Sequence, residues 1–366
     1  MASILEDKFF VKILNIIFKI ISFFLPVKDR ALFLGSPRND TLMENGQMVY
    51  DALTCDKKVI VRKIPHHLQT IAYISYYIMS SKVIVLDDHY RYFMYIPLKK
   101  NQKLIQMWHG PGAFKKVALD LPKPNPREFY THKQYDAFIT SAPSIAPYIE
   151  SGFHISKDKI KPLGYPRSDL IINNQEELEN EFNEKFPNLI GKDIIAYLPT
   201  YRRYDDEVLD YDYDMNWSEF DEFLSKLDMV CLFKRHPLQI SNGLKVVPKY
   251  CKNIIDIGDF SYFPVIIASK LLITDYSSVF FDYLLLDKPM IFYCPDSEEY
   301  LQKNGFYLDF PKDLPGDYCE SFSELLNAIE NPNDNIDYNM FKERYMKACD
   351  GHSTDKVVQL IESYLK

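Results

Sequence analysis

His109 stands at the end of a predicted strand, where a histidine can move a proton. It directly follows the apolar run Leu104–Trp108 and precedes the turn Gly110-Pro111-Gly112. Glycines at a strand end let the backbone approach a ligand closely, and a histidine with a pKa near neutrality can accept a proton from a hydroxyl group. These residues indicate a general base, His109, supported by Gly110 and Gly112. The alternative is a histidine that bonds only to neighbouring backbone groups.

Cationic and hydroxyl side chains follow two other apolar runs. Thr200 and Arg202 come shortly after one run, and Arg235 and His236 follow Lys234 at the end of the next. A guanidinium group matches the geometry of phosphate, and several cationic groups at the mouth of a cleft suit a diphosphate. The alternative for the second pair is a solvated basic turn. Together with His109, the two groups favour a site that handles phosphate.

The stretch Leu271–Asp296 reads as a strand, a turn, a helix and a second strand. The turn carries Asp275, Ser277 and Ser278, whose residue types are those that cap helices at the N-terminus. A helix N-terminus offers unpaired N–H groups and a positive dipole end to a phosphate, and the two serines add hydroxyl donors. We expect Asp275 to be structural or to support the serines. An ordinary capped helix is the alternative.

The elements that must position these residues alternate between short apolar runs and longer helix-like stretches. This alternation predicts parallel sheets with helices on both faces, and ligands then bind outside the carboxyl ends of the strands. The predicted strands are 31–35, 59–62, 83–86, 104–108, 137–140 and 160–163 in the first half, and 194–198, 229–233, 254–256, 271–273 and 290–293 in the second.

The length of the chain predicts two domains. Its 366 residues are more than a single hydrophobic core of ordinary size can accommodate. The strand–helix pattern also restarts after an acidic helix around 176–186. We expect an N-terminal helix and link over 1–30, one α/β domain over 31–170 and a second over 171–366, with a ligand cleft between the two.

The net charge and the cysteine spacing argue against nucleic-acid binding and against a zinc-bound or disulfide-linked protein. The net charge of -8 argues against a general nucleic-acid binder. The six cysteines are scattered and form no CxxC pair, so neither a zinc site nor a disulfide framework is predicted.

Residues 9–25 predict an amphipathic helix. Lys12, Asn15, Lys19 and Ser22 recur at helical spacing, and Phe, Ile and Leu fill the remaining arc. Such a helix suits an anionic bilayer surface, with its lysines toward the headgroups. The two lysines and the short length argue against a membrane span. The alternative is a helix packed on the protein's own core.

The motifs above, in the same order, resemble the CDP-glycerol glycerophosphotransferases of teichoic acid and capsule synthesis. The resemblance covers roughly residues 100–330. The matching pieces are WHGPGAFKK at 108–116, GYPRSD at 164–169, YLPTYR at 197–202, KRHP at 234–237, LITDYSSVFFDYLLLDKPMIFY at 272–293 and PDSEEYLQKNGFYLDF at 295–310.

The resemblance implies a GT-B-like fold, in which two Rossmann-like domains face a cleft, at the cytoplasmic face of the cell membrane. Residues 31–170 would form the acceptor domain and 171–366 the CDP-polyol domain. The implied donor is CDP-glycerol or CDP-ribitol, with glycerol phosphate as the first expectation. The implied acceptor is a lipid-linked teichoic acid or capsular polymer, and no metal is required beyond a possible Mg²⁺ on the donor diphosphate.

The implied reaction is attack of an acceptor hydroxyl on the polyol-side phosphorus, with release of CMP. His109 and His236 would be the catalytic residues, the first as general base and the second on the leaving phosphate. The residues that would bind the donor diphosphate are Thr200, Arg202, Arg235, Ser277 and Ser278.

The sequence departs from the family at two points and leaves other functions open. Pro111-Gly112 stands where the family commonly has Thr-Pro, and Asn304-Gly305 stands where it commonly has Arg-Gly, which leaves the acceptor contacts and the exact donor open. The alternatives are a ribitolphosphotransferase, a GT-B glycosyltransferase that uses a nucleotide sugar, and an inactive membrane-bound partner of a polymer-synthesis complex.

Overall fold

A computed structural model describes residues 8–35, 41–60, 68–125, 129–204, 207–208, 211, 213–235, 246–333 and 335–366. The chain divides into two compact units, one of Met1–Asp169 with Arg344–Lys366 and one of Leu170–Glu343. The first boundary lies one residue from the expected one. The last residues of the chain, which we assigned to the second domain, belong to the first.

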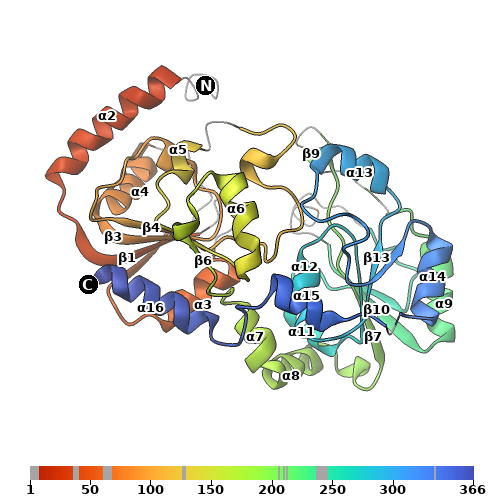
Figure 1. Ribbon diagram of the computed structural model, residues 1–366. Coiled ribbons are helices and arrows are strands. Elements are labelled where there is room, and N and C mark those ends of the chain that lie inside the picture. The colour runs from red at the N-terminus through yellow and green to blue at the C-terminus, as the bar shows by residue number, and fades with distance from the viewer. Residues whose placement is uncertain are drawn as a thin grey trace. The chain divides into compact units, whose positions relative to one another are not determined.

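The first unit is built on a six-stranded parallel sheet, as the sequence predicts (Figure 1). The strand order is β2-β1-β3-β4-β5-β6, so the order reverses between β1 and β3, and ligands in such sheets bind at the carboxyl ends beside the reversal. The strands are β1 Lys28–Leu34, β2 Lys57–Ile60, β3 Ser81–Leu86, β4 Lys103–Gln106, β5 Ala137–Ile139 and β6 Ile160–Lys161.

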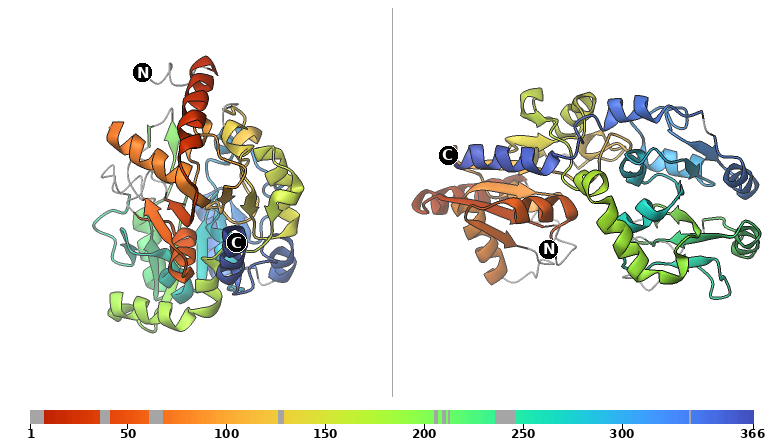
Figure 2. Two further views of the ribbon diagram at one scale, coloured as in Figure 1. Left: turned by 90° about the vertical axis from the view of Figure 1, so that its left-hand side faces the viewer. Right: turned by 90° about the horizontal axis from the view of Figure 1, so that it is seen from below.

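The helices of the first unit include one from the far end of the chain. Val357 and Ile361 of α16 are fully buried in the same core as Val49 of α3, and Asp169 accepts hydrogen bonds from the backbone N–H groups of Ser353 and Thr354 at 3.0 and 2.7 Å. Figure 2 shows α16 alongside this unit. The helices are α2 Lys8–Phe24, α3 Glu44–Ala52, α4 Leu68–Ser80, α5 Phe129–His132, α6 Ala146–Phe153 and α16 Ser353–Leu365.

The second unit repeats this design. Its parallel sheet has the order β11-β10-β7-β12-β13-β14, which reverses between β7 and β12. Its strands are β7 Asp193–Tyr197, β10 Met229–Phe233, β11 Ile254–Asp256, β12 Leu271–Thr274, β13 Met290–Tyr293 and β14 Asp317–Cys319, and a separate hairpin joins β8 Arg203–Tyr204 to β9 Glu207–Val208. We did not predict β14, a short edge strand without an apolar run.

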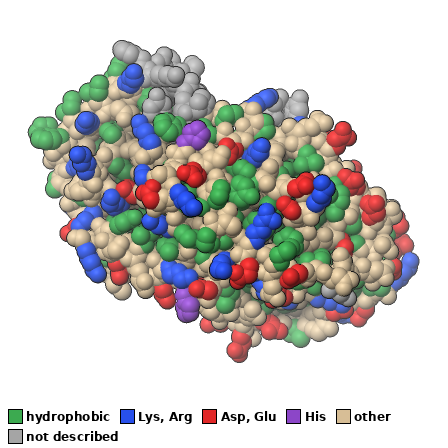
Figure 3. Space-filling view, in the orientation of Figure 1, with side chains coloured by type: hydrophobic (Ala, Val, Ile, Leu, Met, Phe, Trp, Pro, Cys, Tyr) green, Lys and Arg blue, Asp and Glu red, His purple; other side chains and the backbone are tan. Residues whose placement is uncertain are grey.

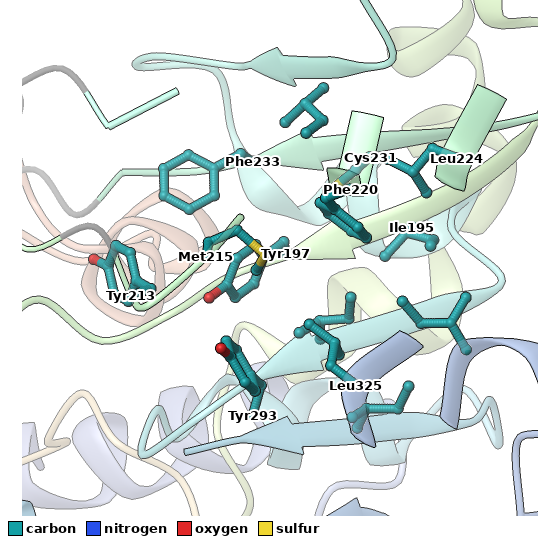
Figure 4. Close-up of a cluster of buried hydrophobic side chains, with 14 of the residues drawn as sticks. Ile195, Tyr197, Tyr213, Met215, Phe220, Leu224, Cys231, Phe233, Tyr293 and Leu325 are labelled. Carbon is teal, nitrogen blue, oxygen red and sulfur yellow. The ribbon is translucent and has the colours of Figure 1, made fainter. Parts of the chain in front are cut away.

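Helices complete the second unit. Figure 4 shows Phe220 and Leu224 of α9 and Leu325 of α14 beside Ile195 and Cys231 of the sheet, and all five side chains are fully buried. The helices are α7 Ser168–Asn173 at the boundary of the units, α8 Gln175–Lys185, α9 Trp217–Lys226, α11 Tyr262–Ala268, α12 Val279–Leu284, α13 Ser297–Asn304, α14 Phe322–Glu330 and α15 Tyr338–Tyr345, which ends in the first unit.

Part of the predicted polar side of α2 packs against the first unit. Asn15 is half-buried and donates to the Met94 carbonyl at 2.8 Å, and Val11 and Ser22 are each 3% exposed. Two of the four polar residues, Asn15 and Ser22, therefore face the first unit. Among the described residues, no helix is both long and apolar enough to cross a membrane.

His132 makes the first unit sensitive to acid. Its side chain is fully buried and lies against the rings of Tyr135 and Phe153. Burial, and then the neighbouring His89 and His154, lower its pKa to about 3. The folded state keeps His132 neutral, whereas the unfolded chain binds a proton below pH ~6.5, so stability falls as the pH drops from that value toward 3.

We expect wild type to lose more stability than His132→Phe between pH 7.5 and 5.5. The difference attributable to this group is roughly 1.4 kcal/mol one pH unit below the unfolded pKa. Urea unfolding at the two pH values measures it, and parallel losses in the two proteins would contradict the assignment.

Candidate active site

His109 lies in the loop that follows β4, and its neighbours fix the direction of its ring. The ring stacks on Trp108 with centroids 4.6 Å apart, and Nδ1 is 3.7 Å from Oδ1 of Asp88. Asp88 follows β3, the strand beside β4. Since Nδ1 faces this carboxylate, Nε2 on the opposite side of the ring is the nitrogen presented to a substrate. The side chain is 40% exposed, so a hydroxyl group can reach it.

Two adjacent carboxylates follow β3, and the sequence analysis did not single them out. Asp88 is paired with His109, as described above, while Asp87 is 1% exposed and accepts a hydrogen bond from Met43 N–H at 3.0 Å. Burial raises the pKa of Asp87 to about 7, against the lowering effect of the Met43 N–H. The signal that could have revealed them is two aspartates directly after the predicted strand 83–86, next to the strand that carries His109.

The glycine turn after His109 is held by a hydrogen bond from its own backbone to a serine side chain. Gly112 has a φ of 68°, in the region that favours glycine, and its N–H donates to Ser141 Oγ at 3.0 Å. Ser141 in turn donates to the carbonyl of Tyr345 at 2.5 Å. Gly110 lies in the same loop. Both glycines lie in the loop after β4, and their support of His109 stays a prediction.

Arg202 joins the loops that follow three strands of the second sheet. Its Nε and Nη2 donate to Asp296 after β13 at 2.5 and 2.9 Å, and its Nη1 donates to Asp275 after β12 at 2.8 Å and to the Thr200 carbonyl after β7 at 2.6 Å. Burial alone would lower the pKa of Arg202, but the carboxylates of Asp275 and Asp296 raise it above its ordinary value. The guanidinium thus stays charged and connects protein groups, while its predicted contact with the donor diphosphate stays a prediction.

Hydroxyl groups lie around the same turn. Thr200 N–H donates to Asp275 Oδ1 at 2.7 Å, while its buried Oγ1 has no hydrogen-bond partner among the residues that the structure describes. Ser277 Oγ accepts from Val279 N–H at 3.3 Å. Ser278 is the N-cap of α12, without a side-chain cap bond. Buried hydroxyls are rarely left unpaired, which agrees with the predicted contact between Thr200 and the donor, a contact that stays a prediction.

The basic residues after β10 are also in contact with the protein. Arg235 pairs through Nε with Asp256 Oδ2 at 2.5 Å, and Lys234 Nζ donates to the carbonyls of Gly258 and Phe260 at 3.2 and 2.7 Å. Asp256 ends β11, so Arg235 is fixed at the carboxyl edge of the sheet. His236, the second predicted catalytic residue, lies outside the described residues.

Comparison with known proteins identifies the family. Residues 41–363 match the family described as CDP-Glycerol:Poly(glycerophosphate) glycerophosphotransferase. The chain belongs to this family. It is 30% identical to the teichoic acid ribitol-phosphate primase of Bacillus spizizenii over 95% of both chains. It is 28% identical to the teichoic acid glycerol-phosphate primase of Bacillus subtilis over 85% of this chain and 80% of that protein.

The fold agrees with that of a solved structure. The wall teichoic acid polymerase TagF superposes with a TM-score of 0.75 at 21% identity, over 97% of this chain and 93% of that chain. The predictions of the family, of two Rossmann-like domains in a GT-B-like fold and of a transferase are therefore confirmed. In the parts of the chain that the structure describes, no group of three or more His, Cys, Asp or Glu residues could hold a metal ion.

Proposed function

We propose that this protein moves a polyol phosphate from a CDP-polyol to a hydroxyl of a lipid-linked acceptor and releases CMP. The observation that carries the proposal is His109 at the end of β4, with Asp88 at its Nδ1. Two of its relatives, matched over most of their own length, are teichoic acid primases, which supports transfer of a polyol phosphate.

In the proposed mechanism, Nε2 of His109 takes the proton of the acceptor hydroxyl. The acceptor oxygen attacks the polyol-side phosphorus, and the bond from this phosphorus to the CMP oxygen breaks. Charge then grows on the leaving CMP phosphate. Phosphoryl transfer gains mainly from positioning and electrostatic stabilisation, and the proposed stabilising groups are Thr200, Arg235, His236, Ser277 and Ser278.

A donor screen tests this function. The purified protein is incubated with a lipid-linked glycan acceptor and with CDP-glycerol, CDP-ribitol or a nucleotide sugar, and the masses of the products are measured by mass spectrometry. One polyol phosphate added from a CDP-polyol is the expected result. Sugar addition would favour a glycosyltransferase, and no product with any donor would favour an inactive partner.

Ser277→Ala tests the donor site. We expect a CDP-polyol KM raised roughly tenfold or more, and CMP inhibition weakened in parallel, because a hydrogen bond to a charged group contributes ~1.5–3 kcal/mol. Steady-state kinetics measures both. Ser321→Ala is the matched control, since Ser321 Oγ likewise accepts from a backbone N–H at the start of a helix, α14, at 3.3 Å. If CMP inhibition is the same in the two variants, the nucleotide lies elsewhere.

We further propose that α2 lies on an anionic membrane surface. Exposed apolar side chains include Ile16, Ile20, Phe23 and Phe24, at 60, 57, 82 and 76% exposed. Figure 3 shows apolar and cationic side chains together at the upper left, where Figure 1 draws α2. An apolar face flanked by lysines suits the boundary between acyl chains and acidic headgroups.

Replacing the two most exposed isoleucines of α2 should release the protein from membranes. We expect Ile16→Gln with Ile20→Gln to pellet at least tenfold less with phosphatidylglycerol vesicles, since each buried isoleucine contributes up to ~1.5–3 kcal/mol. Tyr250→Gln with Met340→Gln removes similarly exposed apolar side chains from the second unit, at 61 and 55% exposed, and should pellet like wild type. Equal pelleting of all three proteins would contradict the proposal.

A further inference from the structure

The loop that carries His109 begins with an unusual backbone conformation. Trp108 has a φ of 58°, which a bulky residue rarely adopts and which the surroundings must hold in place. Two hydrogen bonds do so: Trp108 N–H donates to Oε1 of Gln106 at 2.9 Å, and the Trp108 carbonyl accepts from Nδ2 of Asn45 at 3.1 Å. Because Trp108 directly precedes His109, these bonds set the direction in which His109 leaves the strand.

The side-chain amide of Asn45 bonds to both the Trp108 carbonyl and the Arg167 N–H, and only one orientation of the amide allows this. It is 2% exposed, and its Oδ1 accepts from the N–H of Arg167 at 2.9 Å. A carbonyl such as that of Trp108 only accepts and an N–H only donates, so a flipped amide would lose both bonds. Asn45 is therefore locked between the His109 loop and the segment before α7.

The first turn of α3, which contains Asn45, also contacts the carboxylate loop beside His109. Met43 N–H donates to Asp87, and a Cβ on Gly46 would lie 2.9 Å from Asp87 Oδ2, so glycine permits this close approach. Asp88, the next residue, faces Nδ1 of His109. One helix turn thus touches both loops that decide where the imidazole points.

We propose that Asn45 is a positioning residue for the transfer reaction. Its hydrogen bond to the Trp108 carbonyl holds His109 with Nδ1 toward Asp88 and Nε2 toward the acceptor hydroxyl. The inference rests on His109 being the general base of the proposed function. Misplacing a reacting group by about 1 Å can cost a hundredfold in rate, so the bond is expected to act on kcat.

Asn45→Asp tests the proposal. The new side chain has nearly the same shape and can still accept from Arg167 N–H, but when ionised it turns an oxygen toward the Trp108 carbonyl in place of a donor. We expect kcat to fall about tenfold to a hundredfold, with the KM for CDP-polyol unchanged. The introduced carboxyl group regains a donor when it is protonated, so the rate of the variant relative to wild type should rise as the pH falls.

Gln102→Glu is the matched control. Gln102 is also a 2% exposed amide, and it bonds to the carbonyls of Ile78 and Ser81, both at 2.7 Å, at the opposite end of β4. Gln102→Glu should lose about as much thermal stability as Asn45→Asp, but it should keep the kcat of wild type. If Asn45→Asp does not fold, Asn45→Ser replaces it, with a smaller donor and a smaller expected loss of kcat.

The result that would overturn the inference is a kcat no lower than that of the control at equal stability, or a relative rate that does not depend on pH. Its failure is separable from that of the proposed function. If His109→Ala abolishes transfer and Asn45→Asp does not slow it, only the positioning role is lost. If His109→Ala is active, the general base itself is wrong.

Discussion

His109→Ala will lower the rate of polyol-phosphate transfer by about two to four orders of magnitude, the range that loss of a general base usually costs. The affinity for CDP-polyol should stay close to that of wild type, since the proposed donor groups all belong to the second unit. Single-turnover kinetics gives the rate, and calorimetry with CDP-glycerol and CDP-ribitol gives the affinity.

His352→Ala is the matched control for this experiment. His352 is exposed and stands at the N-cap of α16 without a side-chain cap bond, so its loss should leave transfer unchanged. Comparable turnover in folded His109→Ala and wild type would remove His109 from the mechanism. A parallel loss of donor affinity would show instead that His109 contacts the nucleotide substrate.

Arg202→Met will destabilise the second unit by about 3–5 kcal/mol, because it leaves charged groups buried without their partner. Arg202 is 7% exposed, and its carboxylate partners Asp275 and Asp296 are 1% and 16% exposed. The loops after β7, β12 and β13 would also lose the guanidinium group that hydrogen-bonds to all three. We therefore expect CDP-polyol binding to be lost together with stability, measured by urea unfolding and calorimetry.

A surface ion pair of the same sheet serves as the comparison for Arg202. Lys270 pairs with Asp193, and both side chains are 52% exposed. Exposed pairs of this kind contribute ~0–1 kcal/mol, so Lys270→Met should unfold almost like wild type and bind donor normally. If the two variants lose equal stability, the Arg202 cluster does not hold the loops together.

The sequence by itself determined the elements and the edge at which the chemistry takes place. Apolar runs of strand length alternate with helical stretches, and parallel strands bring their carboxyl ends to one edge of a sheet. His109, Thr200 and Ser277 could therefore be assigned to strand ends before any coordinates were known. The order and spacing of the same motifs indicated the family, which the match over residues 41–363 confirms.

Only the tertiary structure decided which groups meet at those edges. Arg202 finds Asp296 across 94 positions of sequence, Asn45 reaches Trp108 across 63, and α16 returns from the end of the chain to the first unit. Local periodicity records which face of an element is apolar, but it holds no information about which distant carboxylate or carbonyl will satisfy a buried polar group. For the same reason the polar face of α2 could be read from spacing, whereas the Met94 carbonyl that turns Asn15 inward could not.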